Sequence, residues 1–471
     1  MGYSLTQESE QLLGIDVGTT SLKAALFDKT GRLVTNASTE YPTFYPQPGW
    51  AEHEPELWWE AFKKSVHKVL SAVHTTPSRI AGLAVSELSP VIVPVDEHGY
   101  SLRRAIIWMD RREYRGRMTQ NPVAKQLWIR DSEPQVFKKT YKFLNASGFI
   151  YYRLTGEFAS YESLRVPDEL LEKQPRTYFP TQLIGTVSAD SSRETSLAHG
   201  TPVVMGSYDN IAATLGAGIV RPGLALDMTG HSSTVLICTD KRVHAPYCFH
   251  HPISGLWLIA FSTTAGGGLL RWFRDNFASV ERTSSSEDLS SYRMMDAKAA
   301  AIEPGAAGLI MLPYLGGKGQ EGVSPDFNPA ARGTIFGLTS GHTQGHLIRM
   351  FLEANAYEIR WNIEKAESLG LKINDLRVAD GGARSDLWLQ IKADVLGRPL
   401  ARMNSSVMAT PFGDALMAGV GVGVYRNLYS ACDELVEAER LFKPQASTHE
   451  LYSRFYRKYL ELDMRLRDMY H

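Results

Sequence analysis

The stretch that decides the fold is Leu12-Leu-Gly-Ile-Asp16-Val-Gly-Thr-Thr-Ser-Leu-Lys-Ala-Ala-Leu-Phe-Asp28, near the start of the chain. An apolar run ends at Asp16, a glycine and several hydroxyl side chains follow, and apolar residues resume at Leu22. Two apolar runs joined by such a turn predict a β-hairpin. The glycine lets backbone N–H groups approach an anion, and the hydroxyls add donors. The same residues also make good turns where no ligand binds.

Asp16 is the residue that separates these two readings of the turn. A carboxylate beside a phosphate repels it unless a cation lies between them. Asp16 therefore favours a phosphate turn that works with Mg²⁺, held largely through water. The Walker sequence of P-loop proteins is absent from the chain.

The hairpin pattern recurs later in the chain. Leu224-Ala-Leu-Asp227-Met-Thr-Gly230-His-Ser-Ser233 again ends an apolar run in Asp and a glycine turn, and Asp380-Gly-Gly382 gives a third Asp-Gly turn before a helix-like stretch at 387–396. Internal repetition of this kind indicates a duplicated architecture. Helical apolar spacing over 55–73 and 346–369, with apolar strand-like runs at 80–85 and 91–95, predicts that both halves are α/β.

Composition limits the function classes. The 471 residues suggest two large domains, and 44% apolar with 21% charged residues is typical of a globular protein. The net charge of −1 gives no basic field for nucleic acid or an anionic membrane. The three cysteines lack metal-site spacing, the first ten residues lack a signal-peptide core, and no apolar run reaches about 20 residues. We expect a cytoplasmic protein.

Two further stretches carry candidate chemistry. Trp108-Met-Asp110-Arg111-Arg112 ends an apolar strand. It is either one wall of a site for a polyhydroxylated ligand or a surface ion pair, and the residues leave both open. Asp209 and Asn210 follow a strand that ends at Gly206 and open a helix of small residues. Taken alone, Asp209 is read more readily as an N-cap than as a catalytic group.

In order and spacing, these motifs resemble the FGGY carbohydrate kinases, which include xylulose, ribulose, gluconate and glycerol kinases. The similarity runs from Leu12 to about Tyr425. It implies an α/β protein with two actin-like (ribonuclease H-like) ATPase domains and an interdomain cleft. We expect a sugar-binding domain over 1–220, a nucleotide-binding domain over 221–450 and a C-terminal helical tail over 451–471. The motifs that carry the resemblance are Gly14-Ile-Asp-Val-Gly-Thr-Thr-Ser21, Pro48-Gly-Trp-Ala-Glu-His-Glu-Pro55, Trp108-Met-Asp-Arg111, Leu154-Thr-Gly-Glu157, Tyr208-Asp-Asn210, Gly341-His-Thr343, Asp380-Gly-Gly382 and Pro411-Phe-Gly-Asp-Ala415.

The resemblance implies a role for each matching position. Asp209 matches the family's catalytic base and Asp16 the carboxylate near Mg²⁺. The phosphate-loop positions are Thr19, Thr20 and Lys23. The substrate-binding positions are Ser89, Pro90, Trp108, Asp110, Arg111 and Asn210. The nucleotide-contacting positions are Gly230, His231, Gly267, Gly381, Gly382, Ala383 and Asp386.

The function implied is ATP-dependent phosphorylation of a primary hydroxyl of a small sugar or polyol, with a ketopentose such as xylulose favoured, and with ATP and Mg²⁺ as cofactors. The alternatives are a sugar-binding relative with reduced or lost turnover and an actin-like ATPase with a protein partner. Relatives are often dimers, so a homodimer is one expectation for assembly. Three departures bear on activity: His231 stands where the family has Thr, Leu88-Ser89-Pro90 matches neither substrate motif of the family, and the segments 122–125 and 156–203 are short.

Overall fold

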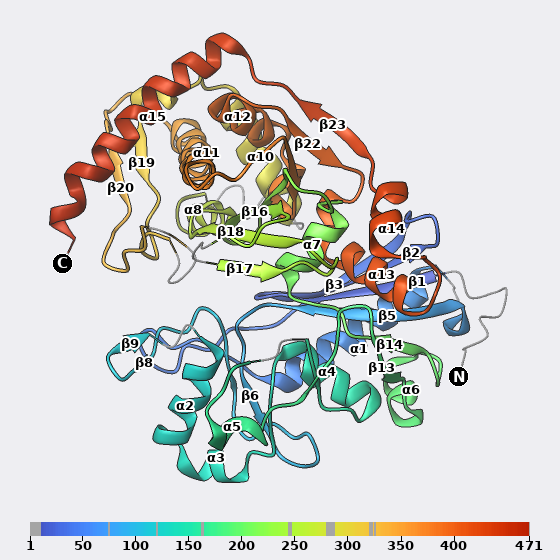
Figure 1. Ribbon diagram of the computed structural model, residues 1–471. Helices are drawn as coiled ribbons and strands as arrows, with labels where there is room; N and C mark the ends of the chain where they lie inside the picture. The colour runs from blue at the N-terminus through green and yellow to red at the C-terminus, as the bar shows by residue number, and fades with distance from the viewer. Residues whose placement is uncertain are drawn as a thin grey trace. The chain divides into compact units, whose positions relative to one another are not determined.

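The computed structural model describes residues 11–73, 76–118, 121–161, 164–243, 247–278, 288–319, 324 and 326–470. The chain forms two compact units. The first contains Met1–Gly218 and Met408–Leu435, and the second contains Ile219–Val407 and Val436–His471. Each unit is built on its own sheet (Figure 1).

The first unit has a six-stranded sheet in the order β13-β14-β5-β1-β2-β3. The predicted hairpin is present: β1 and β2 pair antiparallel, and β5 runs parallel to β1 on its other edge. The strands are β1 (Gln11–Val17), β2 (Ser21–Asp28), β3 (Leu33–Glu40), β5 (Ile80–Glu87), β13 (Leu183–Thr186) and β14 (Pro202–Val204).

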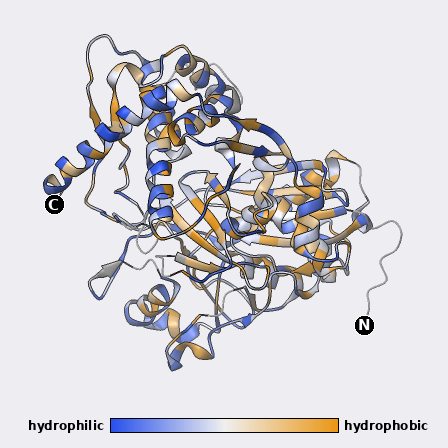
Figure 2. Cartoon of the chain, turned by 45° about the horizontal axis from the view of Figure 1, so that its top comes forward, coloured by the Kyte–Doolittle hydropathy of each residue, from blue (hydrophilic) through white to orange (hydrophobic). Residues whose placement is uncertain are grey.

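Helices cover both faces of this sheet, as Figure 1 shows for α1 (Pro55–Ala72) and α13 (Ala409–Gly421). Alternate residues of β1 explain this. Leu13 and Ile15 join the apolar core that includes Trp58 of α1, whereas Gly14, one residue away in the pleat, lies against the backbone of α13. The sheet is therefore buried on both sides. Figure 2 shows strands coloured as hydrophobic in the interior of the protein.

The remaining elements of the first unit surround the sheet or extend from it. They are β4 (Glu52–His53), β6 (Val93–Val95), β7 (Ala105–Ile106), β8 (Glu113–Tyr114), β9 (Arg117–Met118), α2 (Pro122–Ser132), α3 (Pro134–Lys139), β10 (Lys142–Leu144), α4 (Ala146–Thr155), β11 (Ala159–Ser160), α5 (Asp168–Leu171), β12 (Arg176–Thr177), α6 (Ala189–Thr195), α7 (Asp209–Gly216) and α14 (Leu428–Leu435).

The second unit has a seven-stranded sheet in the order β17-β18-β16-β15-β21-β22-β23. The second predicted hairpin is β15 with β16, and β21 runs parallel to β15 as β5 does to β1. The two hairpins therefore lie in different sheets, and the prediction of two α/β halves is confirmed. The elements are β15 (Leu224–Thr229), β16 (Ser233–Thr239), β17 (Tyr247–His250), β18 (Trp257–Thr263), α8 (Gly267–Phe277), α10 (Asp288–Ala300), β19 (Ile310–Leu312), β20 (Thr334–Phe336), α11 (Gln344–Ser368), β21 (Asp375–Ala379), α12 (Asp386–Leu396), β22 (Leu400–Met403), β23 (Ala438–Phe442) and α15 (Ala446–Leu466).

The division of the chain differs from the predicted one beyond residue 407. We expected 221–450 to form one domain, but α13 and α14 belong to the first unit. The reason is very close packing: a Cβ on Gly14 would lie 1.8 Å from the Pro411 carbonyl oxygen, and one on Gly413 would lie 1.8 Å from that of Ala212. Strand β1 and helices α7 and α13 thus meet backbone to backbone, which only glycine permits.

The predicted C-terminal tail is helical as expected, but it is not separate from the second unit. Residues 451–466 continue helix α15, whose Tyr452, Tyr456 and Tyr459 are buried in the apolar core of the second unit. The helix is part of this core. Within the described parts of the chain, no helix is long and apolar enough to cross a bilayer.

Candidate functional site

The first turn places a carboxylate and a lysine at the end of β1. The antiparallel register sets Lys23 opposite Asp16, and the lysine Nζ lies 3.2 Å from the Asp16 Oδ2. Asp16 is almost fully buried, while about a third of the Lys23 side chain is exposed. The Gly18 N–H donates to the Ser21 carbonyl at 3.0 Å and closes the turn. A carboxylate and an accessible cation therefore stand side by side, one suited to a metal and the other to a phosphate.

Thr19 of this turn is joined to the Trp108 stretch. The indole Nε1–H of Trp108 donates to the Thr19 Oγ1 at 2.9 Å. One residue of the predicted phosphate loop and one residue of the predicted sugar wall are thus in direct contact within the first unit. This link is not evident from the sequence, because 89 positions separate the two residues.

Asp209 is the first residue of α7, and the N-cap position belongs to Tyr208, whose side chain makes no capping hydrogen bond. The Asp209 carboxylate accepts the Asn210 N–H at 2.6 Å and is partly exposed. In the neighbouring Asn210, the side-chain Oδ1 is buried and has no hydrogen-bond partner among the described residues. Such an acceptor at a helix start is suited to a ligand that brings its own donors.

A third carboxylate, Asp414 of α13, lies in the same region. It is fully buried, and its Oδ2 accepts the Ser86 hydroxyl at 2.7 Å; Ser86 is the β5 partner of Asp16. Burial raises the pKa of Asp414 well above its ordinary value, the Ser86 hydrogen bond lowers it, and the charges of Asp16 and Asp209 raise it further. Burial therefore favours the protonated form of this carboxyl group. The motif Pro411 to Ala415 was noted in the sequence, but Asp414 itself was missed; its signal is a lone acid in an apolar helix.

The oxygen ligands present fit Mg²⁺. Among the described residues, no group of three or more His, Cys, Asp or Glu side chains is placed to hold a metal by itself. Mg²⁺ usually binds through one or two carboxylates together with water and substrate phosphates. Asp16, next to a turn of backbone donors and Lys23, offers that chemistry.

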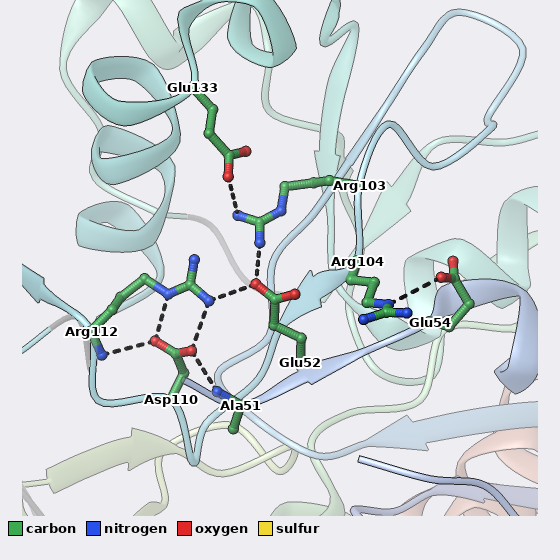
Figure 3. Close-up of polar contacts among 8 residues, drawn as sticks. All are labelled: Ala51, Glu52, Glu54, Arg103, Arg104, Asp110, Arg112 and Glu133. Carbon is green, nitrogen blue, oxygen red and sulfur yellow. Dashed lines mark hydrogen bonds and ion pairs between the residues drawn. The ribbon is translucent and has the colours of Figure 1, made fainter. Parts of the chain in front are cut away.

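Asp110 has a different environment from the one expected of a sugar ligand (Figure 3). It is fully buried, and its carboxylate accepts from Arg112 Nε at 2.7 Å, from Arg112 Nη2 at 2.8 Å and from the Ala51 N–H at 2.7 Å. The Arg112 guanidinium lies over the rings of Trp50 and Trp128, 3.8 and 4.4 Å from their centroids. Protein donors thus contact both Asp110 oxygens. Of the two interpretations offered by the sequence, this arrangement agrees with the ion pair, except that the pair is buried and not at the surface.

The ion pair extends into a network. Arg112 Nη2 also lies 2.7 Å from Glu52, and Glu52 pairs in turn with Arg103, which lies 3.3 Å from Glu133 (Figure 3). Arg111, by contrast, has an exposed side chain, and its N–H donates to the Gly49 carbonyl at 2.7 Å.

Ser89 and Pro90 line a cavity of about 30 Å³ in the first unit. Glu87, Asn145, Gln174 and Tyr208 line it as well. Glu87 ends strand β5 and is almost fully buried, and its Oε2 accepts the Ser147 N–H at 2.8 Å, at the start of α4. Glu87 directly precedes the Leu88-Ser89-Pro90 stretch and was not assigned to the site from the sequence; a charged residue that closes a buried strand is the signal that marks it.

The glycine turns of the second unit come together. The Gly267 N–H, at the start of α8, donates to the Gly230 carbonyl at 2.7 Å. A Cβ on Gly230 would lie 2.4 Å from the Asp380 Oδ2, and one on Gly382 would lie 2.8 Å from Thr229. Asp380 has φ of +71°, a conformation rare for any residue but glycine. Gly230, Gly267, Gly381 and Gly382, with Ala383, thus belong to one glycine-lined region, a backbone cradle of the kind that admits phosphates.

His231 also lies in this region. Its ring is packed against Gly268 of α8. Desolvation lowers the pKa of His231, and the positive charge of Arg271 lowers it further. The imidazole is therefore neutral at pH 7. At the position where the family has Thr, this chain thus has a larger side chain that is also neutral.

The second hairpin does not repeat the electrostatics of the first. Asp227 is fully buried, and its Oδ2 lies 2.6 Å from Lys392 Nζ, which also donates to Thr229 Oγ1 at 2.7 Å. Its charge is neutralised inside the protein, whereas Asp16 borders an accessible lysine. Asp386, predicted to contact the nucleotide, pairs with Arg402 at 2.6 Å and with Arg440.

Comparison with known proteins agrees with the resemblance seen in the motifs. The model for the N-terminal domain of the FGGY family of carbohydrate kinases matches residues 11–116, and the model for the C-terminal domain matches 228–422. Xylulose kinase of Staphylococcus epidermidis is 26% identical over 488 residues, covering 96% of both proteins. Gluconokinase of Bacillus subtilis is 27% identical over 434 residues, covering 82% of both.

Solved structures give the same result for the fold. The crystal structure of xylulose kinase from Rhodospirillum rubrum is 28% identical, covers 98% of this chain and 100% of its own, and superposes with a TM-score of 0.78. The architecture of two actin-like domains predicted from the motifs is confirmed.

Proposed function

This chain belongs to the FGGY family of carbohydrate kinases, and we propose that it transfers the γ-phosphoryl group of ATP to a primary hydroxyl of a ketopentose such as xylulose, with Asp209 as general base. The observation that carries the proposal is the position of Asp209. It opens α7, is partly exposed, and is close enough to Asp414 to act on it electrostatically, as Asp16 does. The proposed proton acceptor and the proposed Mg²⁺ carboxylate thus both act on the same buried carboxyl group, Asp414.

Phosphoryl transfer of this kind requires no covalent bond between the protein and the transferred group. Phosphoryl transfer depends mainly on positioning and on neutralising charge. Mg²⁺, when bound with ATP, would supply charge neutralisation at the phosphates, and Asp16 is the residue that would hold it. Thr19, Thr20 and Lys23 are proposed to contact the phosphates, and the Lys23 side chain, about a third of which is exposed, brings the positive charge for this.

Asp209 would take the proton of the attacking hydroxyl. A carboxylate acts as a base if it lies within hydrogen-bond reach of that hydroxyl in the bound state. Asn210 adds a buried acceptor next to it, which a second sugar hydroxyl would satisfy. Trp108 gives an apolar ring for a C–H face, and its N–H is already bound to Thr19.

The glycine turns of the second unit are proposed to hold the nucleotide. The backbone of these turns would contact the phosphates at Gly230, Gly267, Gly381, Gly382 and Ala383. At Gly230, Gly267 and Gly382 the turns are packed so closely that a Cβ atom would collide with neighbouring protein atoms. His231 is proposed to face the phosphates as a neutral donor, as its lowered pKa indicates.

Asp209→Asn tests the base. Asparagine keeps the size and one acceptor oxygen but takes no proton, so kcat should fall by about 10²–10⁴ while sugar affinity changes little. The matched control is Asp190→Asn, which changes an exposed aspartate in the first turn of α6 and should leave kcat unchanged. Turnover of Asp209→Asn within about threefold of wild type would contradict the assignment.

The two alternatives give different results in one assay. An active kinase releases ADP only when a suitable sugar is present. A sugar-binding relative without turnover binds sugar but releases no ADP, and an actin-like ATPase hydrolyses ATP whether or not a sugar is present. Coupled ADP detection with pentuloses, pentitols, glycerol and gluconate separates these outcomes and identifies the acceptor.

A further inference from the structure

A buried asparagine lies behind the glycine turns of the second unit. Asn355 is on α11, which packs against β16 and β18 (Figure 1), and its side chain is fully buried. The amide nitrogen donates to the Ser233 hydroxyl at 2.9 Å and to the Ala265 carbonyl at 2.8 Å. A carbonyl oxygen can only accept, so Ala265 fixes which end of the amide faces the turns. One amide nitrogen therefore joins two segments that are distant in the chain.

These two segments belong to the turns that are proposed to hold the nucleotide. Ser233 begins β16, directly after the turn that contains Gly230, and Ala265 precedes Gly267 at the start of α8. The turns also meet directly, because the Gly267 N–H donates to the Gly230 carbonyl at 2.7 Å. Asn355 thus joins the same two turns a second time, from the core of the unit.

The Ser233 hydroxyl connects this amide to the buried ion pair of the second hairpin. Its Oγ lies 3.0 Å from the Thr229 Oγ1, which donates to the Asp227 carboxylate at 2.8 Å and accepts from Lys392 Nζ at 2.7 Å. Since the Thr229 proton is directed to Asp227, Ser233 is the donor in its bond to Thr229. Hydrogen bonds that run in one direction polarise and strengthen one another. The chain from Asn355 to Asp227 therefore fixes both ends of the β15–β16 turn.

Packing alone does not explain an asparagine at this position. The Asn355 Oδ1 is buried and has no hydrogen-bond partner among the described residues, and a buried acceptor without a donor costs free energy. Leu352, Ala356 and Ile359, on the same helix, are apolar and fully buried. A polar residue that departs from such a pattern is expected where a site needs it.

We propose that Asn355 is a positioning residue for the nucleotide: its amide sets the spacing of the Gly230 and Gly267 turns, and so directs their backbone N–H groups at the phosphates. The inference rests on the proposed function and adds to it a residue that acts through the backbone of these turns. Donors stabilise a bound charge well only when they are held in place in advance. Loss of the amide should therefore weaken nucleotide binding.

Calorimetry with MgADP, which binds without turnover, tests this role. Asn355→Leu is close in volume and removes both donors, so the affinity for MgADP should fall at least about tenfold. The matched control is Asn362→Leu. Asn362 is a buried asparagine further along α11 that donates to the Phe261 carbonyl, in the middle of β18. This control should bind MgADP within about threefold of wild type.

Ser233→Ala is a smaller change and decides the question if Asn355→Leu does not fold. It removes the hydroxyl that accepts from Asn355, so the affinity for MgADP should fall by at least about threefold. Ser262→Ala is its control, because the Ser262 hydroxyl bonds instead to Thr234, at 2.8 Å, between the same two strands. This variant should bind MgADP as wild type does.

Three outcomes would overturn the inference: a folded Asn355→Leu or Ser233→Ala that binds MgADP as wild type does, controls that lose as much affinity as the test variants, or a wild type that does not bind MgADP. Binding and turnover are measured separately, so the two proposals fail separately. If only the test variants lose MgADP affinity but wild type phosphorylates no sugar, the kinase proposal is refuted and the role of Asn355 stands.

Discussion

Buried aspartates of this protein are stabilised in different ways. Asp110 is neutralised by a bidentate arginine and Asp227 by a buried lysine, whereas burial raises the pKa of Asp414 well above its ordinary value and so favours its protonated form. Asp16 differs because its lysine partner is partly exposed. A partner that reaches solvent can exchange for a ligand, which is why we propose Asp16 as the metal-binding member of the set.

Arg112 gives a test at this scale. Arg112→Leu would leave Asp110 and Glu52 buried without their guanidinium, so the free energy of unfolding should fall by about 3–5 kcal/mol. Arg111→Leu, one position away and exposed, should change it by less than about 0.5 kcal/mol. Chemical denaturation of both variants measures the difference. Equal stability of the two would mean that the Asp110–Arg112 pair does not support this part of the fold.

The sequence predicts some of these residues and not others, for a physical reason. The Asp16 turn is local, because its glycine, hydroxyls and lysine lie within eight positions. The Asp110 environment depends on Ala51, Glu52 and Trp128, which come from distant segments. Spacing along the chain carries no information about those partners, so the two readings of Asp110 could be separated only by the structure.

Among the elements, α7 and α13 are the pair on which the proposed base depends. They cross on two glycines: a Cβ on Gly216 would lie 1.9 Å from the Ala409 carbonyl oxygen, and one on Gly413 would lie 1.8 Å from that of Ala212. Helix α7 carries Asp209 at its start. Its position is therefore fixed by backbone contact with a helix almost 200 residues later in the chain.

Gly413→Ala should separate these helices. The added methyl group meets backbone that cannot rotate away, so we expect a loss of at least about 1–3 kcal/mol in unfolding free energy and a fall in kcat larger than the fall in ATP affinity. Gly216→Ala should act in the same way. Because both changes disturb one contact, the double variant should cost less than the sum of the two; strictly additive losses would contradict the shared crossing.

The helix boundaries show which helices can be predicted from the spacing of apolar residues. The predicted helices at 55–73 and 346–369 are observed as Pro55–Ala72 and Gln344–Ser368, since both have a regular apolar face. α13 was not predicted as part of the first unit. It is buried on all sides, so its apolar pattern does not indicate which elements it packs against.

For the whole molecule, two buried histidines, one in each unit, contribute to the response to acid. His53 accepts the Trp58 indole N–H at 3.2 Å, and His251 donates to the Ile219 carbonyl at 2.9 Å while accepting the Ile253 N–H. Burial lowers the pKa of each to about 4, against about 6.5 when unfolded. Between these values the unfolded chain binds more protons, so stability is full above pH 6.5 and is lost as the pH falls towards 4.

The size of the loss follows from the shift. Each histidine should account for roughly 3 kcal/mol across this pH range. His53→Gln should flatten the pH dependence of unfolding for the first unit only, and His251→Gln for the second only. Urea denaturation at pH 7, 5.5 and 4.5, with tryptophan fluorescence and far-ultraviolet circular dichroism, measures the slopes. Slopes that do not change in either variant would assign the acid response to other groups.

The duplication itself was visible in the sequence, because two Asp-Gly hairpins predict two sheets and two sheets are observed. The return of 408–435 to the first unit was not visible, since no local pattern marks a segment that rejoins an earlier one.

That return has a consequence for synthesis on the ribosome. A nascent chain of about 220 residues has all six strands of the first sheet but lacks α13, so the β1–β5 face stays open until almost two hundred further residues have been translated. The first unit is thus begun first and completed after most of the second. A fragment ending at residue 220 should therefore expose this apolar face and aggregate, and supplying the missing helix as a separate peptide should improve its solubility.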